Sequence, residues 1–221
     1  MHEPASNPQH HHLETLGEIR NLMEQSTRFL SLSGLSGVWA GFCALVGAFL
    51  ANQRLNGRTG GGYTDFQNLR VAVENRSELD ETTAFFIKIA IAVFVAALVG
   101  GIFFTTRKAR NQGKNVWNAA SRRLLLSLFV PLATGGIFCL ALLFHQLPGL
   151  VAPATLVFYG LALVGSAKFT VRDVWSLGVC EILLGLFGCF KPGFSLELWA
   201  VGFGFLHIIY GGWMWWKYER S

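Results

Sequence analysis

The chain has 221 residues and a formal net charge of +5, and 52% of its residues are hydrophobic while only 14% are Asp, Glu, Lys or Arg. Soluble domains average about 25% charged residues, so the composition excludes an ordinary water-exposed surface. The positive balance suits an anionic inner membrane leaflet and is poor evidence for binding nucleic acid.

The N-terminal region divides into two parts. Residues 1–12 are polar, include the run His10–His12, and are predicted to form a disordered tail. In residues 13–28, Leu13, Leu16 and Ile19 recur at helical spacing between charged residues. This pattern predicts an amphipathic helix on the cytoplasmic membrane surface, with docking of a partner protein as the alternative.

Apolar segments long enough to cross a bilayer, which takes about 20 residues, recur along the rest of the chain. Lys88 and Glu181 are the charged residues inside them. A soluble helical core would instead carry charges every few residues along one face. The sequence therefore predicts an all-α polytopic membrane protein whose domain 29–217 has six transmembrane helices. The predicted spans are 29–51, 84–106, 124–144, 150–167, 174–190 and 198–216.

The loop 107–123 orients these spans, because it holds six basic residues and no acidic ones. By the positive-inside rule it is cytoplasmic, and with six spans both termini are cytoplasmic too. Twelve basic residues then lie inside and six outside. The segment 52–83 becomes an external loop.

Short glycine-containing stretches recur in the inward-running spans, for example "GGIFF" at 100–104 and "GGWMW" at 211–215. We interpret the pattern as three helical hairpins in parallel repeat. Small residues also lie four apart along helix faces, as at Ser33, Gly37 and Gly41. Such faces predict close packing of helices against each other or against another subunit.

The hairpin 177–212 resembles the acid-resistance membrane protein family of bacteria, whose members look like repeated hairpins of glycine-spaced helices joined at a proline turn. The likeness is carried by Gly178, Gly185, Gly188, Pro192 and Gly211. The full pattern, including "STRFLSLSGLSG" at 26–37, is also similar to a group of uncharacterised six-span bacterial proteins. These resemblances imply a multi-pass protein of the bacterial cytoplasmic (inner) membrane.

Glu181 stands alone in an apolar span, where a charge at the bilayer centre costs roughly 2.5–3.5 kcal/mol. It lies about 10 Å from the inner end of its span, and His207 lies about 13 Å from the same surface in the next span. We therefore predict that the two side chains approach each other. The pair can act as a proton relay or as a static bond that fixes helix register. Tyr159 and Tyr210 are candidate additional partners, with simple packing as the alternative.

Motifs for catalysis are missing: the sequence has no GxxxxGK[ST], no HExxH and no GxSxG. We therefore predict no catalytic residue, no metal and no cofactor. Lys168, Arg172 and Asp173 cluster at a cytoplasmic turn, where they contact headgroups or a partner or act as a topology anchor.

The predicted function is a non-enzymatic integral membrane protein, a scaffold, sensor or stress-response component. Its expected partners are the lipid bilayer and either a second copy or another membrane or cytoplasmic protein, and no nucleic acid. The alternative is a small-solute or proton-linked transporter or channel that uses Glu181 and His207. An intramembrane enzyme is the third and weakest hypothesis.

Overall fold

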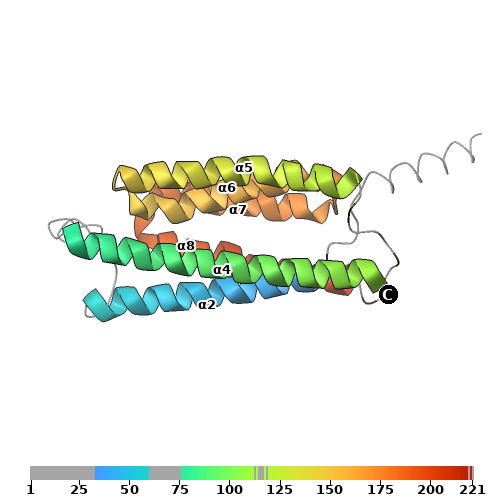
Figure 1. Cartoon of the computed structure of the whole chain (residues 1–221), viewed down its shortest axis with the longest axis horizontal. Helices are drawn as coiled ribbons and strands as arrows, with labels where there is room; N and C mark the ends of the chain where they lie inside the picture. Colours follow the sequence, from blue (N-terminus) through green and yellow to red (C-terminus); the bar gives the residue numbers. More distant parts are fainter. Residues whose placement is uncertain are drawn as a thin grey trace, which may run out of the picture.

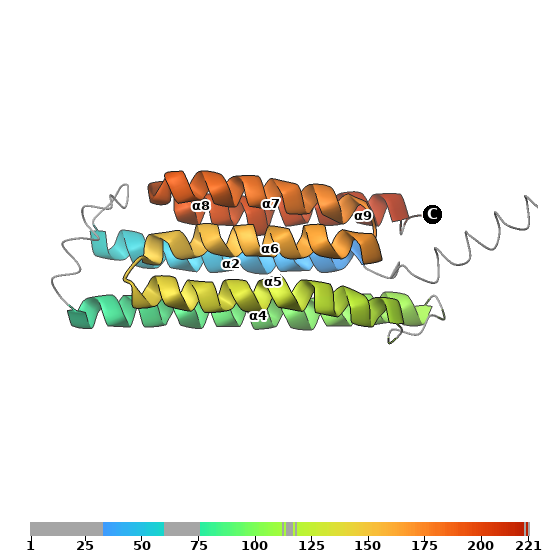
Figure 2. The ribbon, with the colours of Figure 1, turned by 90° about the horizontal axis from the view of Figure 1, so that it is seen from above.

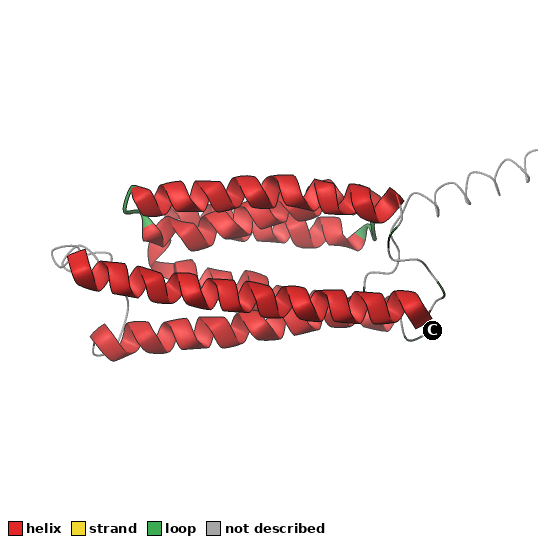
Figure 3. Cartoon of the chain, in the orientation of Figure 1, coloured by secondary structure: helices red, strands yellow, loops and turns green. Residues whose placement is uncertain are grey.

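The computed structural model describes residues 33–59, 76–111, 113, 117, 119–218 and 220, and the regular elements within them are helices (Figure 3). The long helices are α2 (Gly34–Thr59), α4 (Arg76–Asn111), α5 (Ala119–Phe144), α6 (Val151–Ser166) and α7 (Asp173–Phe190). Short 3₁₀ turns lie at η1 (Pro148–Leu150), η2 (Ala167–Phe169) and η3 (Pro192–Phe194). The predicted all-α class is confirmed for these residues.

The last helical segment consists of α8 (Ser195–Trp199), a π-helical stretch η4 (Ala200–Leu206) and α9 (His207–Tyr218), which follow one another without a break. Gly202 and Gly204 lie inside the π-helical stretch. Glycine weakens an α-helix because it adds backbone freedom and no side chain, so the hydrogen-bond pattern can widen there at low cost.

Among the described residues, five helices are long and apolar enough to cross a membrane, judged by length and composition. They are the helical stretches Gly34–Arg54, Thr83–Asn111, Ala119–Phe144, Pro148–Phe169 and Asp173–Phe190. The sixth predicted span, 198–216, falls on the segment that the π-helical stretch divides.

The helices form two layers, with α5, α6 and α7 above α4, α2 and the last helical segment (Figures 1 and 2). Within the layers, α2 packs against α4 and α9, and α6 packs against α5 and α7. The last segment joins the layers, because α8 and η4 also contact α7 and α8 contacts α6.

Glycines bring helix backbones together within each layer. A Cβ added at Gly41 of α2 would lie 2.6 Å from the carbonyl oxygen of Gly204. The same holds in the other layer, where a Cβ at Gly160 of α6 would lie 2.6 Å from the carbonyl oxygen of Gly178. Each pair of helices is therefore closer than any larger residue allows, as in tightly packed membrane helices.

The outer faces of α4 and α5 are apolar and exposed. Phe94, Val99, Phe129 and Ile137 are each 60% or more exposed. In water such continuous apolar faces are a liability for a soluble protein, whereas lipid solvates them. This distribution is the one expected of a membrane-embedded bundle.

Several helices extend beyond the predicted spans, because charged and polar residues continue the helical hydrogen bonding past the apolar core. α4 begins at Arg76 and ends at Asn111, so parts of the predicted loops 52–83 and 107–123 are helical. The predicted tail 1–12, the amphipathic helix 13–28 and the middle of the external loop lie outside the described residues.

Candidate functional site

Glu181 lies on the face of α7 that packs inside the protein. Its glycine neighbours on that face explain why: a Cβ at Gly178 or Gly185 would lie 2.8 Å from a backbone atom of α6. α7 therefore presses this face against α6, and the Glu181 side chain points to the interior with no exposed surface. The space for its carboxylate is provided by Gly202 of η4, where an added Cβ would stand 2.5 Å from Oε2.

His207, the first residue of α9, meets Glu181 from the other layer. Its Nδ1 lies 3.3 Å from Oε1 of Glu181, and the imidazole is also buried. The same Nδ1 lies 3.0 Å from the carbonyl oxygen of Gly202. Because a carbonyl oxygen only accepts hydrogen bonds, Nδ1 carries a proton in this arrangement. The structure thus brings together the two groups that the sequence placed at matching depths.

Tyr159 of α6 completes the cluster. Its hydroxyl lies 2.8 Å from Nε2 of His207, at the other side of the ring. Phe203 covers both rings, with its centroid 4.9 Å from that of Tyr159 and 5.9 Å from that of His207. We refer to Glu181, His207 and Tyr159 as the polar cluster; it joins α6 and α7 of one layer to α9 of the other.

The carboxylate of Glu181 is poorly satisfied. Within the described part of the chain neither of its oxygens has a hydrogen-bond partner. The 3.3 Å contact with His207 is consistent with this, since the Nδ1 proton points at Gly202 and the carboxylate lies off that axis. An unpaired buried carboxylate is expensive, so its charge depends on the charge of the imidazole beside it.

The other predicted site residues lie elsewhere. The Tyr210 hydroxyl is buried but has no hydrogen-bond partner among the described residues, and its ring packs beside Leu163 and Leu177. Lys168 and Arg172 are exposed at the η2–α7 turn, and Nζ of Lys168 lies 5.0 Å from its neighbour's ring, that of Phe169.

Asp173, in contrast, is engaged at the start of α7. Its Oδ2 accepts hydrogen bonds from Nζ of Lys217 at 2.8 Å and from the hydroxyl of Tyr218 at 3.1 Å. The hydrogen bonds that the Lys217 ammonium donates, first to Asp173 and then to Tyr218, raise the pKa of Lys217 above its ordinary value of 10.5. This tie joins the first turn of α7 to the last turn of α9.

Two participants were missed at the sequence level. Gly202 was hidden among many glycines, although the Gly-x-Gly pattern at 202–204 inside a predicted span is an available signal. The tie between Asp173 and Lys217 was also missed, although Lys217 directly follows the cytoplasmic end of the predicted span 198–216 and Asp173 directly precedes the predicted span 174–190. In the described ranges no group of three or more His, Cys, Asp or Glu side chains is placed to hold a metal ion.

No protein-family model matches the chain, and comparisons with curated proteins and with solved structures found no match.

Proposed function

We propose that the chain is a six-span, non-enzymatic integral membrane protein with cytoplasmic termini that senses proton activity through the polar cluster. Support for the sixth span comes from the helical run of Ser195–Tyr218, which lies antiparallel to α7. The basic composition of 107–123 supports the orientation. Placement in a bacterial cytoplasmic membrane belongs to the same proposal and rests on the resemblance of 177–212.

One observation carries the sensing role: a fully buried carboxylate lies 3.3 Å from a buried imidazole across the contact between the two layers. The charge of such a pair matters far more than at a surface, because both groups are buried. The two layers contact each other mainly through the last helical segment. The protonation of Glu181 and His207 therefore affects the contact between the layers.

The number of protons bound by Glu181 and His207 determines how strongly the two layers hold together. When Glu181 and His207 share one proton in addition to the proton on Nδ1, the pair has no net charge. It is then either a carboxyl group beside a neutral imidazole or a carboxylate beside an imidazolium. In the second form Nε2 donates to the Tyr159 oxygen, and in the first it accepts the Tyr159 hydroxyl proton. One further proton leaves a buried cation with no counter-charge, which weakens the contact between layers. Acidification therefore weakens the contact between the two layers.

Proton-linked transport is the second candidate. It is favoured by the two oxygens of Glu181, which lack hydrogen-bond donors among the described residues and are available to a moving proton. Intramembrane carboxylates and histidines commonly form such relays. The two candidates differ in one respect: a transporter moves protons across the membrane, whereas a sensor changes shape without flux.

Proton flux in vesicles distinguishes them. The protein is reconstituted as wild type, as Glu181→Gln and as Glu81→Gln, a control that removes an exposed carboxylate on α4. The sensor proposal expects no flux above empty vesicles from any of the three, together with an acid-induced loss of thermal stability whose pH profile changes in Glu181→Gln and is kept in Glu81→Gln. Flux by wild type that disappears only in Glu181→Gln establishes the transporter instead. A stability profile that is the same in all three proteins contradicts the sensing role.

A further inference from the structure

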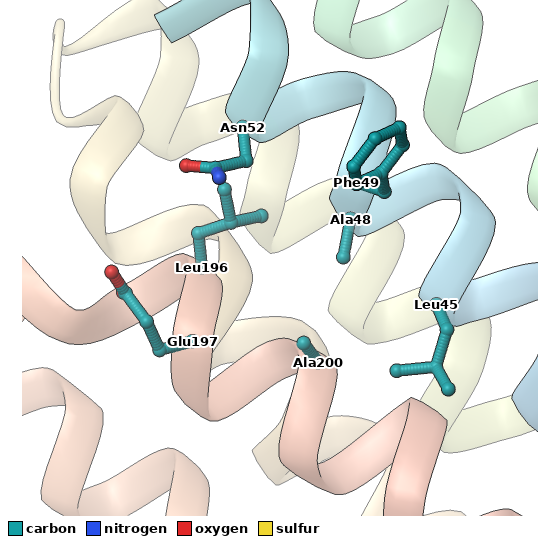
Figure 4. A pocket seen from close by; sticks show the side chains of 7 residues that line it. All are labelled: Leu45, Ala48, Phe49, Asn52, Leu196, Glu197 and Ala200. Carbon is teal, nitrogen blue, oxygen red and sulfur yellow. The ribbon is translucent and has the colours of Figure 1, made fainter. Parts of the chain in front are cut away.

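A groove outside the polar cluster lies between α2 and the beginning of the last helical segment (Figure 4). Its volume is about 270 Å³. One wall comes from α2 through Leu45, Ala48, Phe49 and Asn52. The other wall comes from α8 and the first residue of η4, through Leu196, Glu197 and Ala200.

The lining of the groove changes from apolar to polar along its length. Figure 4 shows Asn52 and Glu197 toward one end, with Leu196 between them and their polar atoms on the same side, and Leu45 and Ala200 toward the other. Leu45 and Asn52 are seven residues apart on α2, which corresponds to about 10 Å along the helix axis. The groove therefore matches an amphipathic ligand that has a polar head and an apolar tail.

The polar end lies at headgroup depth in a membrane. Asn52 lies two residues before the end of the membrane-crossing stretch Gly34–Arg54, and Glu197 lies one residue before the predicted sixth span, which begins at 198. The apolar residues continue inward from there, beside the acyl chains. These depths match a phospholipid whose headgroup lies at Glu197 and one of whose acyl chains lies along the groove.

The charge of Glu197 selects the type of head. Its side chain is exposed, and within 33–59, 76–111 and 119–218 the structure gives its carboxylate no hydrogen bond or ion pair. A carboxylate at this position attracts a cation. A primary ammonium has three donors for the carboxylate, whereas a quaternary ammonium has none.

We propose that this groove binds a phospholipid with a primary-amine headgroup, of the phosphatidylethanolamine class. The ammonium hydrogen-bonds to Glu197, and one acyl chain lies between α2 and α8 against Leu45, Ala48 and Ala200. The inference depends on the membrane embedding of the bundle and is independent of the proton-sensing role.

The test is lipid retention by native mass spectrometry. Delipidated full-length protein is titrated with phosphatidylethanolamine or with phosphatidylcholine of the same acyl chains. We expect the amine lipid to bind about tenfold more tightly, the value of one charge-assisted hydrogen bond. Glu197→Gln abolishes this preference, and Glu81→Gln keeps it. Ala200→Leu fills the groove without a change of charge and lowers the binding of both lipids.

Three results would overturn the proposal. The first is equal affinity of wild type for the two lipids, and the second is a preference for the amine lipid that survives Glu197→Gln. The third is a protein dimer that forms without lipid and is lost in Ala200→Leu, which assigns the groove to a second copy of the chain. If Glu197→Gln does not fold, Ala200→Leu decides, because unchanged retention in that variant also contradicts the assignment.

Discussion

Gly202 and Glu181 occupy complementary space: a Cβ at residue 202 would lie 2.5 Å from Oε2 of Glu181 and 2.5 Å from Cδ2 of Leu156. A real Cβ does not approach this closely, so the π-helical stretch accommodates the buried carboxylate because residue 202 has no side chain. The relationship explains how a helix from one layer can lie directly over a carboxylate from the other.

Gly202→Ala is therefore expected to destabilise the protein by about 1–3 kcal/mol, the usual cost of overpacking a filled interior. Gly212→Ala is the matched control on the same helical segment, because an added Cβ there has no atom within 4 Å. Thermal unfolding in detergent measures both variants. Equal stability of the two would show that the carboxylate does not occupy the space beside residue 202.

The hydrogen bond between Tyr159 and His207 gives a second prediction. Tyr159→Phe removes a hydroxyl that lies 2.8 Å from Nε2 and is expected to cost about 0.5–1.5 kcal/mol. Tyr210→Phe removes a buried hydroxyl that has no partner among the described residues, so it should be neutral or slightly stabilising. Equilibrium unfolding in mixed micelles compares the two, and a larger loss in Tyr210→Phe would contradict the assignment of the partner.

The glycine contacts within the layers give a third. Gly41→Ala and Gly160→Ala each place a Cβ 2.6 Å from a backbone oxygen of the neighbouring helix, and each should lower the unfolding free energy by about 1–3 kcal/mol. Gly101→Ala and Gly136→Ala introduce the same methyl group into open space on α4 and α5. We expect these two controls to be neutral or stabilising by up to about 1 kcal/mol. Destabilisation of all four to the same extent would indicate a general intolerance of alanine.

The tie between Asp173 and Lys217 gives a prediction about pH. Since the hydrogen bond to Asp173 raises the pKa of Lys217 in the folded protein, its stabilisation is fully present below the ordinary value of 10.5. It is lost as the pH rises through the raised pKa. Wild type should therefore be more stable than Lys217→Met at neutral pH, and the difference should fade in strongly alkaline buffer.

Lys168→Met is the control for this tie, because Lys168 is exposed and its Nζ lies against the ring of its own neighbour. Thermal melts at a series of pH values give the comparison. If the difference between wild type and Lys217→Met stays constant through the alkaline range, the tie to Asp173 does not depend on the ammonium charge.

The meeting of Glu181 and His207 was accessible from the sequence because each is a lone polar residue in an apolar helix. The depth of a residue in either span of one hairpin can be counted from the same membrane surface. A rise of about 1.5 Å per residue is therefore enough to align residues of the two spans. The all-helical class was accessible for the same reason, since long apolar runs leave few other structures in a membrane.

The layer arrangement could not be derived in this way. The glycines on α2 and α7 predicted close packing, but a small residue does not indicate which helix packs against it. In the structure α2 packs against α9, which lies at the far end of the chain. The π-helical stretch faces the carboxylate of α7 at Gly202, and the Gly-x-Gly pattern at 202–204 does not by itself specify that contact. The repeat of three parallel hairpins stays a prediction.

The central claim is that acidification weakens the contact between the two layers by adding a proton to the pair of Glu181 and His207. Its most direct test is a distance measured by electron paramagnetic resonance between spin labels at Leu183 of α7 and Val46 of α2, both exposed, with the native cysteines replaced by serine. Lowering the pH from about 7.5 to about 3.5 passes the ordinary pKa values of both His and Glu. We predict that the distance grows in the otherwise unaltered protein, and that Glu181→Gln, which removes one of the two proton-binding groups of the pair, changes this response to pH. A distance that does not change with pH, or that changes equally in both proteins, would contradict the claim.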